Sequence, residues 1–283
     1  MKILLIIFMV TIILLCLFKK RKENFYNSHK LELQNSKHFN NYINSIDEKM
    51  KVVKVKNYKK KNFKKLYLDH LSDINEKELT DISKLTKICD QKLRKLNLKI
   101  FFKYPWKFLK SKNSLEMGMP YTIHDMIIIP ENFFIKIRLG EYNRNLLDTL
   151  IHEKIHVIQR FNQDKFNSFY KISYPFLNKK INTIPKRFNK DNMVNPDSNN
   201  QYWTYKFDNN LYFVYLKYNQ GRVFSHAINK NGLKGNLNKL KSKYNFKKHT
   251  SIYHPNEIFA CEVAGQIMNN NIAKKYLVFL SNF

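Results

Sequence analysis

The segment 146–158 carries apolar side chains at three- and four-residue spacing, and inside it lies the pentapeptide His-Glu-Lys-Ile-His at residues 152–156. This spacing predicts a helix that is capped by Asn143 or Asn145 and runs to about Phe161. The two histidines are four residues apart, so they share one face of the helix, while aliphatic residues cover the opposite face. A fold for this chain must therefore bury the aliphatic face and leave the histidine face for a site.

Two imidazoles at this spacing can bind one zinc ion. Nitrogen atoms of His152 and His156 reach a common metal at about 2.0 to 2.1 Å, and Glu153 stays free to contact a metal-bound water. Zinc lowers the pKa of its water toward about 7, while the carboxylate moves a proton from the water to the leaving amine. The pentapeptide therefore favours metal-dependent hydrolysis with Glu153 as the general base. The alternative is a structural role, in which hydrogen bonds between helices satisfy both histidines.

A catalytic zinc ion takes a third protein ligand and keeps one position for water. The downstream segment 254–262 supplies the candidates. Pro255 at the first position of a helix places Glu257 in its first turn, where the helix dipole favours an ionised carboxylate. Glu262 lies about 140° farther around the same helix, so we expect only one of the two glutamates to face the metal. Glu257 is the preferred ligand, and the alternatives are His254 and Glu262.

The residues after the pentapeptide exclude the metzincin class, which requires Gly and His where this chain has Gln159 and Asn162. Residues 257–260, Glu-Ile-Phe-Ala, instead resemble the Glu-Phe-Phe-Ala motif of gluzincin metallopeptidases such as the anthrax lethal factor and related Pro-Pro endopeptidases. The resemblance implies an α+β, zincin-like domain with a small mixed sheet and two zinc-bearing helices. It also implies one Zn2+ per chain, bound by the two histidines and Glu257, and a protein or peptide substrate.

The same resemblance assigns two further elements. In zincins, substrate pairs as an extra strand with the edge of a small sheet ahead of the catalytic helix. Residues 122–130 resemble that element and predict a substrate edge strand at Ile127, Ile128 and Ile129. The lethal-factor group also has a Tyr seven residues before its Glu ligand that stabilises the oxyanion, and this chain has Thr250 there. The candidates to replace that Tyr are His249, Tyr253 and His254.

Residues 3–18 form a nearly uninterrupted apolar run with basic residues on both sides. A helix of this length spans about 24 Å, and no small-x-small cleavage site follows it. We therefore expect an uncleaved transmembrane anchor at residues 1–18 rather than a signal peptide, with the remainder of the chain in the cytosol. A basic spacer at 19–70 and a zincin-like domain at 71–283, with an insertion at about 165–250, complete the predicted single-pass membrane protein.

The chain is strongly basic, with 51 Lys and Arg against 22 Asp and Glu and a formal charge of +29. Such a field attracts polyanions, and lysines that alternate with apolar residues in the spacer suit contact with anionic lipid. Abundant Lys, Asn, Ile, Phe and Tyr are also typical of an AT-rich genome. The alternative function is a basic membrane-associated protein that binds nucleic acid or anionic lipid and has a structural or inactive zinc helix. No nucleic-acid module is recognisable, so no specific nucleic acid is expected.

The remaining patterns predict a mixture of helices and strands. The expected elements are a helix from Asn75 to Leu96, strands at 98–102 and 126–130, a hairpin of 211–218 with 222–228, and a helix from Pro255 to about Met268. The three cysteines form no ligand pair or disulfide framework, which indicates a reducing compartment.

Overall fold

The computed structural model describes residues 28–56, 58–59, 62–140, 143–186, 188, 192–198, 201–219, 222–247 and 250–283. The predicted anchor at residues 3–18 lies outside this part of the chain. Within it, no helix is long and apolar enough to cross a membrane. The assignment as a single-pass membrane protein with a cytosolic catalytic domain is corrected on this finding, because a bilayer needs about 20 consecutive apolar residues in a spanning helix.

Most of the stretch expected to be a basic spacer folds into helices that belong to the core. These helices are α2 (Ser28–Asn35), α3 (Lys37–Ser45), α4 (Glu48–Lys54) and α5 (Phe63–Asp69). In α3, the buried residues Phe39, Tyr42 and Ile43 follow one another at helical spacing. The side chain of Ser36 caps this helix by accepting hydrogen bonds from two backbone N–H groups. The frequent lysines obscure this amphipathic pattern in the sequence, although one of them, Lys54 of α4, is itself buried.

A four-stranded mixed sheet follows these helices. It contains β1 (Leu71–Ser72), β2 (Phe108–Ser111), β3 (Tyr121–Ile123) and β4 (Met126–Pro130) in the order β1-β2-β4-β3. Strand β4 is parallel to β2 and antiparallel to β3. The prediction that Ile127, Ile128 and Ile129 form the substrate edge strand is therefore wrong, because β4 lies inside the sheet. Their continuous apolar run is typical of a strand that is covered on both faces, and the edge strands of this sheet are β1 and β3.

The long helix α6 (Glu76–Lys95) begins as predicted. The Asn75 side chain accepts a hydrogen bond from the Glu78 backbone, and the Glu78 side chain accepts one from the Asn75 backbone. The strand expected at 98–102 is instead a short helix, α7 (Ile100–Lys103). Asn97 ends α6 in the left-handed backbone region, and the chain then turns helically again, with Phe101 N–H donating to Leu98 O.

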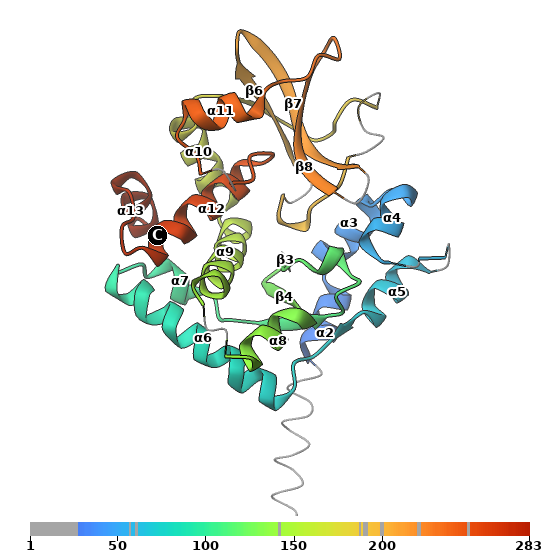
Figure 1. Ribbon diagram of the computed structural model, residues 1–283, viewed down its shortest axis with the longest axis vertical. Coiled ribbons are helices and arrows are strands. Elements are labelled where there is room, and N and C mark those ends of the chain that lie inside the picture. Colours follow the sequence, from blue (N-terminus) through green and yellow to red (C-terminus); the bar gives the residue numbers. More distant parts are fainter. Residues whose placement is uncertain are drawn as a thin grey trace, which may run out of the picture.

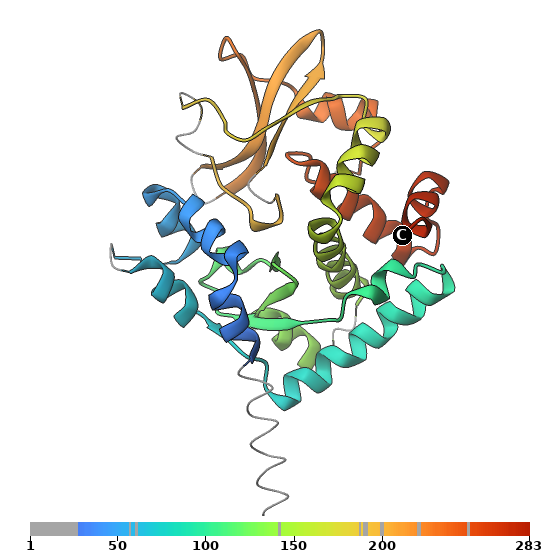
Figure 2. The ribbon, with the colours of Figure 1, turned by 180° about the vertical axis from the view of Figure 1, so that it is seen from behind.

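Two helices at the centre of the molecule carry the predicted site residues. They are α9 (Arg144–Phe161) and α12 (Pro255–Met268), and they pack directly against each other. Helix α9 also contacts α6, β3 and β4, so it forms the link between the first sheet and the C-terminal helices. Figures 1 and 2 show α9 and α12 between the long α6 and a second sheet at the opposite end. The bounds predicted for both helices are confirmed.

The second sheet occupies the predicted insertion. Its strands β5 (Leu177–Ile181), β6 (Tyr202–Phe207), β7 (Asn210–Asn219) and β8 (Arg222–Asn229) pair antiparallel in sequence order, which confirms the hairpin. The described chain is completed by α8 (Glu131–Arg138), α10 (Gln163–Ser173), α11 (Leu237–Lys243), α13 (Lys274–Ser281) and the short 3-10 helices η1 (Glu116–Gly118) and η3 (Pro196–Ser198). Helices and two small sheets together make a mixed α+β fold.

Candidate metal centre

The side chains of His152, His156 and Glu257 converge from α9 and α12. The two histidine Nε2 atoms lie 2.9 Å apart. Glu257 Oε2 lies 3.5 Å from His152 Nε2, and Glu257 Oε1 lies 3.4 Å from His156 Nε2. The structure therefore brings all three residues predicted as metal ligands to one place.

Local capping interactions fix this placement. The Asn143 side chain accepts a hydrogen bond from Leu146 N and begins α9. On α12, His254 is the N-cap, and its side chain accepts a hydrogen bond from Asn256 N. Pro255 follows at the start of the helix, so Glu257 lies in the first turn. The positive end of the helix dipole therefore points toward the Glu257 carboxylate.

The three groups shift one another's protonation. Burial raises the pKa of Glu257, but His156, His152 and Tyr253 lower it by more, so the pKa of Glu257 falls to about 2. Burial lowers the pKa of His152, but Cys261 and Glu257 outweigh this effect and raise the pKa of His152 well above its ordinary value. For His156, burial is the largest influence and its pKa is lowered. Glu257 is thus an anionic donor at neutral pH.

Glu153 is buried beside the cluster, on the face of α9 that lines the largest described pocket near these residues. The pocket has a volume of about 420 Å³ and is also lined by His152, Tyr253 and Glu257. Glu153 Oε2 is buried and has no hydrogen-bond partner among the described residues. Burial, together with the nearby Asp197 carboxylate, raises the pKa of Glu153 well above its usual value. An unpartnered buried carboxylate oxygen is costly, which indicates a group or ion that the chain itself does not supply.

A chain of hydrogen bonds orients His156 from behind. His156 Nδ1 lies 2.7 Å from Gln159 Oε1, and Gln159 Nε2 donates to Tyr170 Oη at 2.9 Å and to the Asn256 backbone O at 3.0 Å. Tyr170 Oη donates in turn to Asn256 Oδ1 at 3.0 Å. All four of these residues are buried. The imidazole is therefore held with its Nε2 directed at the cluster.

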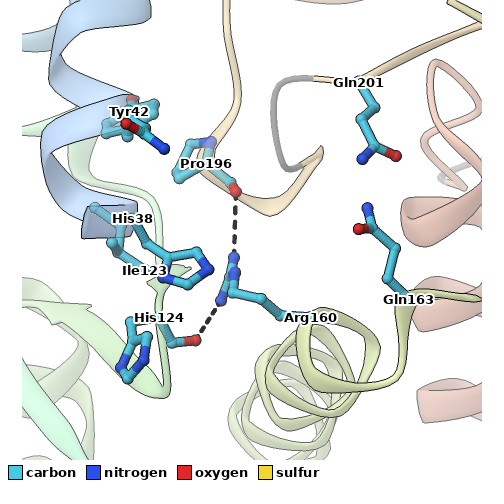
Figure 3. A pocket seen from close by; sticks show the side chains of 9 residues that line it. His38, Tyr42, Ile123, His124, Arg160, Gln163, Pro196 and Gln201 are labelled. Carbon is cyan, nitrogen blue, oxygen red and sulfur yellow. Dashed lines mark hydrogen bonds between the residues drawn. The ribbon is translucent and has the colours of Figure 1, made fainter. Parts of the chain in front are cut away.

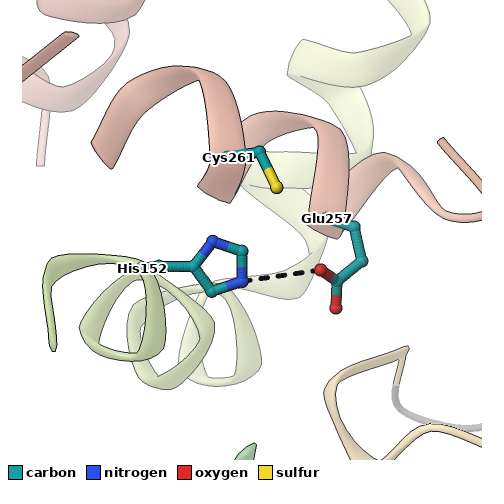
Figure 4. Close-up of side chains that lie close together, drawn as sticks. All are labelled: His152, Glu257 and Cys261. Atoms are coloured by element: carbon teal, nitrogen blue, oxygen red, sulfur yellow. Dashed lines mark ion pairs between the residues drawn. The ribbon is translucent and has the colours of Figure 1, made fainter. Parts of the chain in front are cut away.

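His152 has a different neighbour. Cys261, one turn after Glu257 on α12, directs its sulfur toward the His152 ring (Figure 4). Ligand atoms of His152, Glu257 and Cys261 all lie within 4.8 Å of one another. The sequence predicts no role for Cys261, because a single cysteine without a partner nearby forms no ligand pattern.

A second group that could hold a metal contains a residue that sequence analysis missed. Ligand atoms of His156, Asp197 and Glu257 lie within 4.8 Å of one another. Asp197 belongs to η3, between β5 and β6 in the sequence, and is only 5% exposed. Just before it, Asn195 Nδ2 donates to Tyr253 Oη and lies 3.4 Å from Glu257 Oε1. No local sequence pattern around residue 197 predicts this position, because the contact depends on the path of the chain between β5 and β6.

The three predicted oxyanion candidates have different positions. Tyr253 lines the pocket, and its hydroxyl donates to Glu257 Oε1 at 3.1 Å. His254 is buried at the helix cap, and its pKa is lowered to about 3, chiefly by burial. His249 lies outside the described residues. Tyr253 is therefore the candidate that the structure places beside the ligands.

The alternative ligand Glu262 lies away from the cluster. Its Oε1 accepts hydrogen bonds from Thr250 Oγ1 at 2.7 Å and from Lys247 N at 3.3 Å. Thr250, which stands where the lethal-factor group has its Tyr, is buried in this contact. His254 likewise uses Nδ1 for the cap of α12. The structure thus favours Glu257 among the three residues considered as third ligand.

A further group of potential ligands, Glu32, His124 and Asp125, lies outside the cluster. Lys107 Nζ contacts Glu32 Oε1 at 2.8 Å and Asp125 Oδ2 at 2.7 Å, so a lysine already occupies the place of a cation. The adjoining pocket in Figure 3 is dominated by Arg160, which donates to the backbone O atoms of His124 and Pro196. This region has the character of a structural ion-pair network.

Comparison with known proteins found no matching protein-family model, no matching curated protein and no matching solved structure.

Proposed function

We propose that this protein is a zinc-dependent peptidase of gluzincin type, with His152, His156 and Glu257 as metal ligands and Glu153 as general base. The observation that carries the proposal is the short separation of the two histidine Nε2 atoms from each other and of each from one oxygen of the Glu257 carboxylate. Ligands at about 2.05 Å in tetrahedral positions are separated by about 3.3 Å. The three separations here are 2.9, 3.4 and 3.5 Å. Movements of a few tenths of an ångström would fit them around one zinc ion.

The kind of donor supports zinc over harder cations. Two imidazoles and one carboxylate suit zinc, whereas magnesium and calcium prefer oxygen ligands throughout. Ferrous iron also accepts two histidines and a carboxylate. The buried Glu153 favours hydrolysis, because this carboxylate is not among the three ligands and has an oxygen without a partner. Such a group suits the removal of a proton from water.

The roles of the residues follow from their positions. When bound, zinc supplies Lewis acidity toward the scissile carbonyl and lowers the pKa of water. The Glu153 carboxylate accepts a proton from the attacking water and passes it to the nitrogen of the leaving amine. The positive charge of a bound zinc ion would lower the pKa of Glu153 and favour its ionised form, against the effect of the neighbouring Asp197 carboxylate. The Tyr253 hydroxyl donates a hydrogen bond to the oxygen on which negative charge develops.

The test uses the full chain, purified with zinc, and a mixed peptide library whose cleavage is read by mass spectrometry. We expect about one zinc per chain in the wild type, loss of zinc in His152→Ala, and loss of cleavage with zinc retained in Glu153→Gln. Glu262→Gln is the matched control, because Glu262 is a buried carboxylate on α12 outside the cluster. We expect Glu262→Gln to bind zinc and to cleave peptides as the wild type does. A metal-free wild type, or cleavage that persists in Glu153→Gln, would refute the proposal.

A further inference from the structure

The residues Asn195–Ser198, here called the η3 segment, lie directly on the candidate metal centre. Asp197 Oδ1 accepts hydrogen bonds from Thr122 N at 2.9 Å and from Thr122 Oγ1 at 2.6 Å. Asn256 Nδ2, from α12, donates to the backbone O of Asp197 at 3.1 Å. The segment is thereby tied both to the first sheet and to the helix that carries Glu257.

This arrangement blocks the β3 edge of the first sheet at Thr122. Thr122 is the central residue of β3, an edge strand, and its backbone N–H is used by the Asp197 side chain. Arg160, at the end of α9, holds the same segment by donating to Pro196 O at 3.2 Å. Figure 3 shows Arg160 between Pro196 and His124. A peptide strand cannot pair with β3 at Thr122 while the η3 segment is in place.

The buried carboxylates near Asp197 favour a cation beside them. Three carboxylates, Glu153, Asp197 and Glu257, are each less than a tenth exposed. Arg160 is the cation that the described chain brings to them, at 3.9 Å from Asp197 Oδ1. Buried like charges are costly unless they are paired or coordinate a metal. When all three carboxylates are ionised and both histidines are neutral, a divalent ion together with Arg160 would bring the charge of this group to zero.

We propose that Asp197 is a fourth protein ligand of the metal, so that the described conformation is a latent, closed form of the site. This inference rests on the proposed function and adds its regulation. Four protein ligands complete a tetrahedral site, whereas catalysis needs one position for water. Peptide cleavage then requires the η3 segment to leave the metal, and its departure also frees the β3 edge for an extended substrate.

The discriminating variant is Asp197→Asn. An amide keeps the volume of the side chain and an oxygen for the two Thr122 donors, but it is a much weaker metal ligand than a carboxylate. Glu262→Gln is the matched control, because Glu262 is equally buried and also accepts from a threonine hydroxyl. Both proteins and the wild type are loaded with Co2+, whose visible absorption reports its ligands. Acetohydroxamate, which needs an open metal position, is the binding probe.

In Asp197→Asn we expect a changed Co2+ spectrum, hydroxamate binding tighter by about tenfold or more, and faster peptide cleavage by the zinc form. Wild type and Glu262→Gln should share one spectrum and one weaker hydroxamate affinity. Identical spectra and affinities in all three proteins would overturn the role of Asp197 as ligand, while zinc and Glu153-dependent cleavage would still stand. Slower cleavage by Asp197→Asn would also overturn latency. Absence of bound metal in all three proteins would instead refute the proposed function.

Discussion

His156 and Gln159 form a 2.7 Å contact between the ring Nδ1 and the side-chain Oε1. Gln159 is itself fixed, because its Nε2 donates to Tyr170 and to the Asn256 backbone. An amide oxygen can only accept, so Nδ1 carries the proton and Nε2 presents its lone pair to the cluster. This is the arrangement of a metal-binding histidine, whose second ring nitrogen usually donates to an oxygen that fixes the tautomer.

Replacing Gln159 should therefore weaken metal binding without removing a ligand. We expect Gln159→Leu to lower zinc affinity by about 10- to 100-fold, the usual cost of losing such an outer partner. Competition with a chromophoric chelator measures the change. Gln163→Leu is the control, because Gln163 follows on α10 and contacts neither histidine in the described structure. Equal zinc affinity in the two variants would show that Gln159 does not orient the ligand.

The proposed function gives Tyr253 a role in the transition state in addition to its hydrogen bond to Glu257. Removing one oxyanion donor commonly lowers kcat by about 10²- to 10³-fold. We expect Tyr253→Phe to show a loss of this size in kcat, with KM and zinc content close to those of the wild type. A merely structural Tyr253, which only positions Glu257 through its 3.1 Å hydrogen bond, would instead reduce zinc affinity. Steady-state kinetics and metal analysis of the same preparations separate the two roles.

The parts that could be predicted from sequence are those that local signals specify. Apolar spacing and caps define α9, and Pro255 after a capping residue defines the start of α12. Because both helices are set locally, His152 and Glu257 could be assigned to them correctly. Their packing against each other is not local, and it was expected only from a resemblance to a known motif.

The wrong or missing predictions concern features that depend on how strands and segments are arranged in space. An apolar run such as Ile127 to Ile129 shows that a strand is buried, but not which strands flank it. The position of Asp197 depends on the path of the chain between α10 and α12, so no spacing in the sequence predicts its contact with His156. In the segment before residue 70, frequent lysines lowered the mean hydropathy and concealed buried residues such as Phe39 at helical spacing.

The cap residue His254 should make stability depend on pH. Burial, with smaller effects from His156 and Lys180, lowers the pKa of His254 to about 3, and the opposing effect of Glu257 is not enough to restore it. The unfolded chain protonates this histidine near pH 6.5, so between about 6.5 and 3 it binds more protons than the folded protein. Stability is therefore fully present above pH 6.5 and is lost as the pH falls.

We expect this group alone to cost about 1.3 kcal/mol of unfolding free energy at pH 5.5 relative to pH 7.0. His254→Asn retains a side chain that can cap α12 but does not titrate. Urea unfolding of both proteins without metal, at pH 7.0 and 5.5, measures the difference. Parallel losses in the two proteins would mean that His254 is protonated in the folded state or contributes nothing to the acid response.

A buried ion pair lines the same pocket as Glu153. Lys54 and Glu116 are 1% and 4% exposed, and their side chains lie in direct contact. Tyr42 and Tyr67 both donate hydrogen bonds to Glu116 Oε1. Removing one partner of a buried pair leaves an uncompensated charge and commonly costs about 3 to 5 kcal/mol. We expect a loss of this size in the unfolding free energy of Lys54→Met.

A double variant separates the effect of the unpaired Glu116 charge from the effect of altered packing at residue 54. In Lys54→Met with Glu116→Gln, the buried charge is gone and an amide oxygen remains for the two tyrosine hydroxyls. We expect the double variant to regain most of the stability, because the cost of an unpaired carboxylate exceeds the value of the ion pair itself. Urea unfolding of the two single variants and the double variant completes the cycle. If the double variant is as unstable as Lys54→Met, the loss comes from the shape of the methionine and not from the charge of Glu116.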